Sequence, residues 1–375
     1  MILDLKELKD ACSKILTAID NNNLSSYSGM LEFKTVDGIL NLNITNREYY
    51  VSIKLGGCDE DFHATINANL FLKLISQLTT EDVELKTTDT TLIVKANGKY
   101  KFPLIYDGEK LLDLPEITIL NPTTSFNIES SILNSILVNN SKELSKIPKG
   151  NKVAINQVQK MYYVDEQGAI TMYNGACVNK FTLEKPVKLL FNSNLVKLFS
   201  LFKNTSVMFT LGYDALSDTI IQTKVQFKTS DIEITAILNC DDSLVKMMPA
   251  EVIRARAFND YPYTVTLNRS ALLSTIQRVM LFATDTTSGN YKTCSKFTFT
   301  NTCCTISDYA EENVEDITYA NEVAADLNYS TMIDLVDIKL ALESNNDQYI
   351  TINFGDHQAI VIAKDNIYTV IPEIN

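Results

Sequence analysis

One order of helix and strand signals recurs three times along the 375-residue chain. In residues 83–105, VELKTTDTTLIVKANGKYKFPLI, apolar and polar residues alternate in three short runs separated by polar turns, which is typical of an antiparallel meander. The stretch before it, ANLFLKLISQL, has apolar residues at helical spacing. A similar helix followed by strands recurs in SNLVKLFSLFK and STMIDLVDIKLALES and the residues after them. Such repetition predicts that the repeated units assemble into one continuous structure.

Each repeat also opens with an amphipathic helix. These helices are predicted in LDLKELKDACSKIL, ESSILNSILVNNSKEL and NRSALLSTIQRVMLFA, and the proline-bounded stretches 114–126 and 249–265 connect one repeat to the next. The pattern predicts an α+β fold of three tandem domains, residues 1–122, 123–260 and 261–375, each with two helices packed on antiparallel sheets. Three independent domains in a row are the alternative.

The composition is that of an ordinary globular protein, with 45% hydrophobic and 21% charged residues. No apolar run is long enough to span a bilayer, and the charged start MILDLKELKDAC is unlike a secretory signal. The seven cysteines include no C-x-x-C pair, which favours a reducing compartment over a disulfide scaffold. We therefore expect a cytoplasmic protein.

Motifs for catalysis are missing. The sequence has no P-loop, G-x-S-x-G, H-E-x-x-H or Rossmann glycine motif, and His63 and His357 are its two histidines. The acidic runs Asp59–Asp61, Asp241–Asp242 and Glu311–Glu312 could hold magnesium in a nuclease, but they lie in predicted turns, where carboxylates are usually solvated. We predict no enzymatic activity, no metal and no cofactor, with a metal-dependent nuclease or another DNA-processing enzyme that uses the acidic pairs as the alternative.

Several stretches resemble one family when they are taken in order. LNLNITNREYYVSI holds a turn at Thr45–Glu48, VELKTTDTTLIVKANGKYKFPL is followed by LLDLPEI, NRSALLSTIQRVMLFATD opens the third repeat, and AIVIAKDNIYTVIPEIN ends the chain. Together with the threefold order, these stretches resemble the bacterial-type sliding clamp, the beta subunit of DNA polymerase III. The turn at residues 173–178 keeps only the family's glycine, and the tail lacks its basic residue, which favours a divergent copy such as a phage-encoded one.

The resemblance implies a DNA polymerase processivity factor, not an enzyme. Two protomers would close head to tail into a homodimeric ring of six domains, with helices lining a hole that holds double-stranded DNA irrespective of sequence. A polymerase bound to the ring then has a high effective concentration at the primer end. A trimeric clamp of the eukaryotic or T4 type fits less well, because those protomers carry two domains. The implied protomer interface comprises Tyr100, Phe102, Leu281, Phe282, Lys73, Glu311, Glu312 and Glu315.

The net charge of −13 argues against simple adhesion to nucleic acid, but it leaves room for a local basic surface. The helices expected to face the hole carry Lys6, Lys9, Lys14, Lys73, Lys142, Lys146, Lys149, Lys197, Lys203, Arg269, Arg278 and Lys339. Lys73 and Lys197 are predicted to occupy one position in two repeats, where the third has Asp337. For any one of these cations, a position on the solvent-exposed face of an amphipathic helix explains its presence equally well.

In the family, the polymerase, the clamp loader and other proteins insert a short apolar peptide between the second and third domains. By resemblance, the groove here comprises Ile155, Tyr173, Gly175, Ala176, Cys177, Val178, Lys246, Met247, Thr369, Val370, Ile371 and Pro372. The alternative for Val370 and Ile371 is that they complete the core of the last strand. Neighbours on a strand point to opposite faces, so we expect that explanation to fail for at least one of them.

Overall fold

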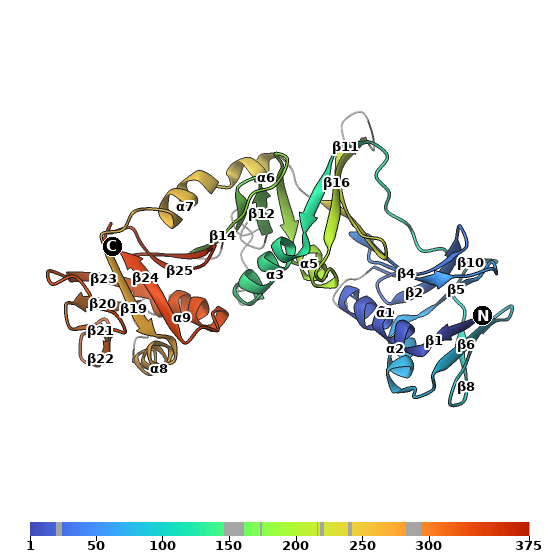
Figure 1. Ribbon diagram of the computed structural model, residues 1–375, viewed down its shortest axis with the longest axis horizontal. Coiled ribbons are helices and arrows are strands. Elements are labelled where there is room, and N and C mark those ends of the chain that lie inside the picture. The colour runs from blue at the N-terminus through green and yellow to red at the C-terminus, as the bar shows by residue number, and fades with distance from the viewer. Residues whose placement is uncertain are drawn as a thin grey trace. The chain divides into compact units, whose positions relative to one another are not determined.

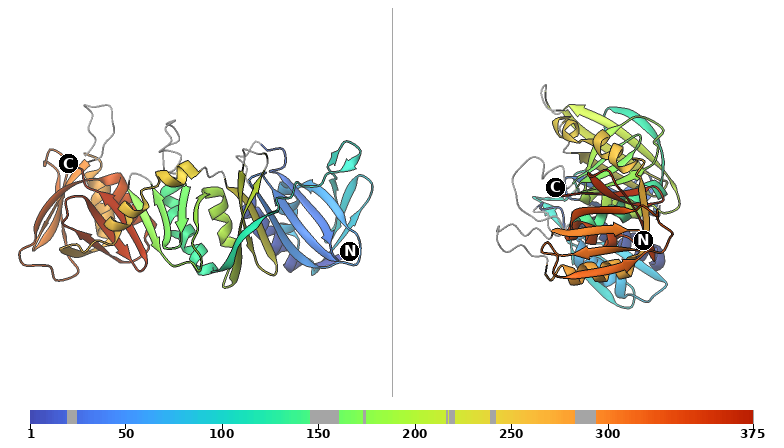
Figure 2. Two further views of the ribbon diagram at one scale, coloured as in Figure 1. Left: turned by 90° about the horizontal axis from the view of Figure 1, so that it is seen from above. Right: turned by 90° about the vertical axis from the view of Figure 1, so that its left-hand side faces the viewer.

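The order of the elements confirms the threefold pattern. A computed structural model of the chain describes residues 1–19, 25–145, 161–172, 175–215, 217, 221–238, 242–282 and 294–374, with the side chains of 138–145, 242 and 244 left aside. In these described residues, each repeat runs strand, helix, four strands, helix, three strands. The elements can be followed by label in Figure 1 and from two further directions in Figure 2.

The bounds of the elements show how regular the repeats are. The first repeat comprises β1 (Ile2–Asp4), α1 (Leu5–Ala18), β2 (Met30–Val36), β3 (Ile39–Thr45), β4 (Tyr49–Gly57), β5 (His63–Asn67), α2 (Ala68–Gln77), β6 (Asp82–Thr87), β7 (Thr91–Lys95) and β8 (Lys99–Pro103). The second comprises β11 (Pro122–Glu129), α3 (Ser130–Ser145), β12 (Met161–Asp165), β13 (Gly168–Met172), β14 (Ala176–Lys180), β15 (Lys188–Asn192), α5 (Ser193–Lys197), the 3₁₀ turn η1 (Leu198–Leu201), β16 (Ser206–Ala215), β17 (Ile221–Lys228) and β18 (Ile232–Leu238). The third comprises β19 (Tyr263–Asn268), α8 (Arg269–Val279), β20 (Cys294–Thr300), β21 (Cys303–Ser307), β22 (Val314–Thr318), β23 (Asn328–Asp334), α9 (Leu335–Ser344), β24 (Tyr349–Phe354), β25 (Ala359–Lys364) and β26 (Ile367–Pro372). The connectors hold β9 (Tyr106–Asp107), β10 (Lys110–Leu111), α6 (Asp242–Met247) and α7 (Ala250–Ala257).

Four helices start by the same device, an acidic or amide side chain on the last residue of the preceding strand. The side chains of Asp4, Asn67, Asn268 and Asp334 accept hydrogen bonds from backbone N–H groups two or three residues further on. Such caps satisfy N–H groups that have no partner inside the helix and stabilise it by about 1 kcal/mol each. The strand therefore passes directly into the helix at each of these junctions.

The described residues form two compact units, and each takes part of the middle repeat. One unit is Met1–Asn134 with Asn194–Asn239, and the other is Ser135–Ser193 with Cys240–Asn375. In the first, an eight-stranded sheet runs β11-β16-β17-β18-β4-β3-β2-β5, and in the second another runs β15-β12-β13-β14-β26-β25-β24-β19. Each sheet joins strands of two repeats, so the repeats are not independent domains. The boundaries near 122 and 260 stay a prediction.

Paired helices fill the space between an eight-stranded and a four-stranded sheet in each unit. In the first unit, α1 and α2 lie side by side (Figure 1), and Phe71 of α2 contacts Phe33 of β2 and Phe102 of β8, with ring centroids 5.3 Å and 5.4 Å apart. Phe33 belongs to the eight-stranded sheet and Phe102 to the sheet β1-β6-β7-β8. In the second unit, α8 and α9 share one buried cluster with strands of both sheets.

Two helical segments differ from the sequence-based prediction. The helix expected at residues 193–203 is α5 followed by η1, because the chain tightens at Ser200, whose hydroxyl donates to the carbonyl of Lys197 (2.8 Å), and closes with Phe202 N–H on the carbonyl of Phe199 (3.1 Å). The second connector holds the helix α7, which starts directly after Pro249. Proline has no N–H to leave unpaired, so it is compatible with a helix start.

Candidate nucleic-acid and partner interfaces

The predicted DNA-facing lysines of α1 differ in their surroundings. Lys6 is exposed. The ammonium of Lys9 donates to the carbonyl of Leu78 (2.6 Å), just past the end of α2, and Lys14 pairs with Asp10 (2.6 Å) one turn earlier on the same helix. Lys6 is thus the cation on α1 best placed to meet an external phosphate.

The second helices of the repeats carry their cations at two different positions. Counted from the strand residue before each helix, Lys197 and Lys339 are both fifth and Lys73 is sixth. The alignment of Lys73 with Lys197 and Asp337 was therefore wrong, and Asp337 is buried, 3% exposed. Lys73 and Lys203 are exposed and Lys197 is half-buried. Lys203 was predicted to lie on the helix, but it follows η1, which ends at Leu201. Lys142 lies in α3 with its side chain outside the described part, and Lys146 and Lys149 also lie outside it.

The cations predicted for the third repeat have partners within the chain. The guanidinium of Arg269 donates to the carbonyls of Asp347 (2.9 Å) and Leu342 (3.2 Å), near the end of α9. The Leu342 carbonyl lies in the last turn of α9, at the negative end of the helix dipole, which favours a cation there. Lys339 lies 3.8 Å from Glu343 on the same helix face.

Arg278 and Glu315 pair with each other, although one was predicted to face DNA and the other to face Lys73 of a second protomer. The guanidinium approaches the carboxylate through two nitrogens, Nε at 2.7 Å and Nη2 at 2.5 Å. The hydrogen bond from Arg278 lowers the pKa of Glu315, against a smaller opposing effect of burial. Glu311 likewise pairs with Lys296 (2.8 Å). Glu311 and Glu315 are thus each paired with a cationic side chain of the same chain.

The predicted interface residues on β8 are buried or half-buried, whereas those that follow α8 are exposed. Strand β8 is an edge of its four-stranded sheet, as an interface strand must be. Its Phe102 is 4% exposed and belongs to the core of its own unit, while Tyr100 is half-buried. Leu281 and Phe282, in the turn just after α8, expose 74% and 58% of their surface. They are not core residues, and two adjacent exposed apolar side chains are suited to contact another protein.

Pairing of β14 with β26 brings together two distant parts of the predicted groove. Ala176 is opposite Val370 and Cys177 is opposite Thr369 in the ladder. These residues, with Val178 and Ile371, are all buried. Gly175 precedes β14, and Pro372 ends β26 half-buried. Ile155 and Tyr173 lie outside the described residues.

Alternation along these strands divides the groove residues between the two faces of the sheet. Ala176, Val178 and Val370 pack in one cluster with residues of α7, whereas Ile371 packs in the cluster of α8 and α9. The prediction that Val370 and Ile371 cannot both be core residues was wrong, because helices cover this sheet on both faces. Lys246 and Met247, at the end of α6, are exposed, Met247 by 46%.

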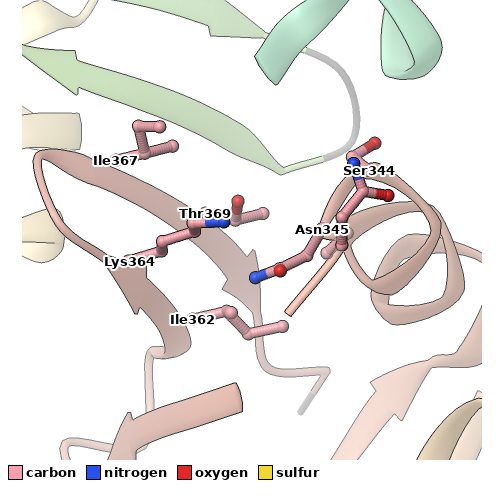
Figure 3. Close-up of a pocket in the computed structure, with 8 residues that line it drawn as sticks. Ser344, Asn345, Ile362, Lys364, Ile367 and Thr369 are labelled. Atoms are coloured by element: carbon pink, nitrogen blue, oxygen red, sulfur yellow. The ribbon is translucent and has the colours of Figure 1, made fainter. Parts of the chain in front are cut away.

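A small pocket lies on the α9 side of the same sheet (Figure 3). Thr369 lines it with Ile362, Lys364, Ile367 and residues at the end of α9, among them Ser344 and Asn345. Its volume of about 70 Å³ is well below the roughly 300 Å³ of the smaller ligand pockets. Because this pocket lies on the α9 side of the sheet, Thr369, which lines it, faces away from α7.

A buried ion pair that the sequence did not reveal fixes α7 on the sheet. Arg254 of α7 donates through Nη1 (2.8 Å) and Nη2 (2.5 Å) to the two carboxylate oxygens of Asp165, at the end of β12. The two residues are 4% and 3% exposed. No local pattern links positions 89 residues apart, so this contact could only be found in the folded chain.

The acidic runs considered for a nuclease site lie apart from any metal-ligating cluster in the described residues. Asp59, Glu60 and Asp61 are exposed, and Glu311 is paired with Lys296. Asp241 and the side chain of Asp242 lie outside the described residues. Within those residues, three potential ligand side chains converge at one place, Glu32, His63 and Asp113. Among the described helices, none has the length and apolarity needed to cross a membrane.

Comparison with known proteins decides the fold. No family model matches the sequence. The DNA polymerase III beta subunit of Thermotoga maritima superposes on 100% of this chain and 98% of its own, with a TM-score of 0.74 and 14% sequence identity. The chain has the beta sliding-clamp fold. The DnaN sliding clamp of Pseudomonas aeruginosa, in a structure with bound griselimycin, gives a TM-score of 0.75 over 100% and 99% of the two chains at 11% identity.

In sequence, the similarity is more local. A stretch of 132 residues is 24% identical to the beta sliding clamp of Helicobacter pylori, strain J99, and covers 34% of each chain. The DNA polymerase III subunit beta of Borrelia burgdorferi shares 13% of its residues with this chain but superposes on all of it, with a TM-score of 0.74. The prediction of three tandem clamp-type domains in an α+β fold is thereby confirmed.

Proposed function

We propose that this protein is a DNA polymerase processivity factor, a sliding clamp that encircles duplex DNA and tethers a replicative polymerase. The observation that carries the proposal is the beta sliding-clamp fold over 100% of the chain. A chain with three clamp-type repeats needs one further copy of itself to reach six repeats, the number that the family resemblance gives to a closed ring. The function is binding, without a bond made or broken, and we expect it in the cytoplasm at the nucleoid.

The protomers are proposed to join head to tail through the edge strand β8 and the third repeat of a second copy. An unpaired edge strand can extend a sheet into another chain, and the four-stranded sheet of the third repeat ends in the edge strand β22. The exposed Leu281 and Phe282 follow α8, which contacts β22. They supply the apolar centre that such an interface needs, because a few well-buried apolar residues carry most interface energies.

DNA is proposed to contact the cations on the helices, and Lys203 just after η1, without regard to base sequence. Lys6, Lys73 and Lys203 are exposed, and phosphate contacts position a protein without reading sequence. The net charge of −13 is compatible with this role if the cations are concentrated where the duplex passes. A weak, sequence-independent contact suits a ring that must slide.

Partner proteins are proposed to bind beside α6, which contacts β15 of the sheet that also holds β14 and β26. The exposed Lys246 and Met247 are the members of the predicted groove best placed to touch a peptide, and Met247 offers an adaptable apolar wall. Deleting the last residues would not test this site. Ile371 is fully buried, and Glu373 accepts a hydrogen bond from Tyr329 (2.8 Å), so the deletion would damage the core.

Particle mass and shape in solution test the proposed assembly. We expect mass photometry to give a dimer of 42.0 kDa chains and electron microscopy to show rings with a central hole. A trimer would favour the eukaryotic type of clamp, and a monomer at every concentration would contradict the ring. Incubation with magnesium and plasmid should leave the plasmid uncut, and cleavage would favour the nuclease alternative.

A further inference from the structure

A polar cluster lies on the face of the first eight-stranded sheet opposite its helices. Glu32 and Lys34 on β2 and His63 on β5 share this face, since Lys34 and His63 are direct partners in the ladder. The stretch that follows β10 crosses the same face and brings Asp113 to it, where Lys34 reaches the Asp113 carboxylate at 2.6 Å. In Figure 1, β2, β5 and β10 lie close together.

Three ligand atoms from three segments converge in this cluster. The Nε2 atom of His63 is 3.2 Å from Oε1 of Glu32 and 3.6 Å from Oδ1 of Asp113, and all three atoms lie within 4.8 Å of one another. In a tetrahedral zinc site with bonds of about 2.0–2.1 Å, neighbouring ligand atoms are about 3.3 Å apart. The two measured separations bracket that value.

We propose that Glu32, His63 and Asp113 bind a zinc ion and tie the stretch after β10 to the sheet. An imidazole with two carboxylates suits zinc, whereas magnesium and calcium prefer oxygen ligands alone. The fourth position is left for water, because the side chains of Asp113 and His63 are 64% and 25% exposed. Zinc binding at this cluster does not depend on the proposed clamp function.

The buried ligand is held in place by the groups around it. Glu32 is 1% exposed, and its Oε2 accepts a hydrogen bond from the side chain of Asn43 (2.9 Å). Its Oε1 accepts a hydrogen bond from the N–H of Leu114 (3.0 Å). The second lone pair of that oxygen can then point toward His63. Such outer contacts orient metal ligands and raise affinity.

Negative charge predominates around the cluster. At the cluster, the two carboxylates of Glu32 and Asp113 face one ammonium group, that of Lys34, which contacts Asp113. A divalent cation would offset this excess. Lys34 is the group that now supplies positive charge to Asp113, so it competes with the metal for one ligand. With a side chain 40% exposed, it can swing away.

Zinc binding by the full chain tests the proposal. Calorimetric titration with Zn²⁺ should give one site per chain, and Co²⁺ in its place should show the visible absorption bands of a tetrahedral complex. His63→Ala should weaken zinc binding by at least about 100-fold, since even outer contacts of a metal site affect affinity about 10- to 100-fold. His357→Asn is the matched control and should bind as the wild type does, because it removes the other histidine, which stands at φ 56°, a conformation asparagine tolerates.

Lys34→Met separates a metal site from a plain hydrogen-bonded cluster. Without the competing ammonium, zinc affinity should rise about fivefold, the equivalent of one exposed ion pair. A structural cluster with no affinity for metal would show no such gain. The proposal is overturned if the wild type and Lys34→Met both fail to bind zinc, or if His63→Ala binds it as tightly as the wild type.

Discussion

Replacing Leu281 and Phe282 together with alanine tests the proposed protomer interface. The two side chains expose 74% and 58% of their surface, and full burial of a leucine or phenylalanine side chain contributes about 2.5 kcal/mol. Covering the exposed parts therefore contributes about 3 kcal/mol, and about 6 kcal/mol in a head-to-tail dimer, which contains the interface twice. Because about 1.4 kcal/mol is a factor of ten, the dimer dissociation constant should rise roughly 10⁴-fold.

The assay is mass photometry or sedimentation over a dilution series, with circular dichroism to follow the fold. Since both side chains are exposed, the double variant should stay folded and melt close to the wild type. Leu120→Ala is the control, because Leu120 is 73% exposed and lies in the first connector, which is not part of the proposed interface. A double variant that remains dimeric at the same dilutions as the wild type would refute the interface.

Three further outcomes follow from the ion pairs and the exposed cations. Arg254→Ala should lower the free energy of unfolding by about 3–5 kcal/mol in denaturant titration, because it leaves the buried Asp165 carboxylate without its partner. Burial alone would raise the pKa of Asp214, but hydrogen bonds from a lysine and two backbone N–H groups outweigh it and lower that pKa. This stabilisation is present above the unfolded-state pKa of about 3.9 and is lost as the pH falls through the folded-state value, so the stability difference between wild type and Asp214→Asn should shrink on acidification from about pH 6 to about pH 3. Replacing the exposed Lys73 and Lys203 with alanine should weaken duplex binding equally for different sequences. The log–log slope of affinity against salt, measured by fluorescence anisotropy, should become shallower by about 0.9 for each phosphate that is no longer neutralised.

The local pattern was enough to predict the repeat. The meander at residues 83–105 appears as β6, β7 and β8, because alternation and polar turns are local signals. The helices begin at capping residues such as Asn67 and Asp334, which can be recognised in the sequence. The fold class followed from these signals together with the ordered resemblance.

Pairing between repeats could not be predicted in the same way. The contact of β18 with β4 and that of β14 with β26 join strands that are far apart in sequence, and they decide where each unit ends. The error about Val370 and Ile371 has the same origin. Alternation shows that neighbours face opposite sides, but only the fold shows that α7 covers one side and α8 and α9 the other.

The candidate sites were harder to predict from the sequence than the repeat or the fold class. Charge and exposure on a helix can be inferred from its periodicity, which suffices for Lys6 and Lys73. The ion pair of Arg278 with Glu315, which lies on β22, cannot be inferred in this way. No motif in the sequence connects His63 with Glu32, and the approach of the two residues depends on the register between β2 and β5. Register is set by the packing of whole strands, so no short motif reveals it.

Retention on one plasmid before and after it is cut tests the central claim, that this chain holds DNA by encircling it. The protein is incubated with a nicked circular plasmid at high concentration, passed through a sizing column in moderate salt, and challenged with an enzyme that cuts the circle once. A ring should stay on the circle, because topology does not depend on salt, and should leave through the ends of the linear product, although the sequence and the phosphates are nearly unchanged. Protein that elutes equally with the circular and the linear plasmid, or that the circle does not retain at all, would contradict the account.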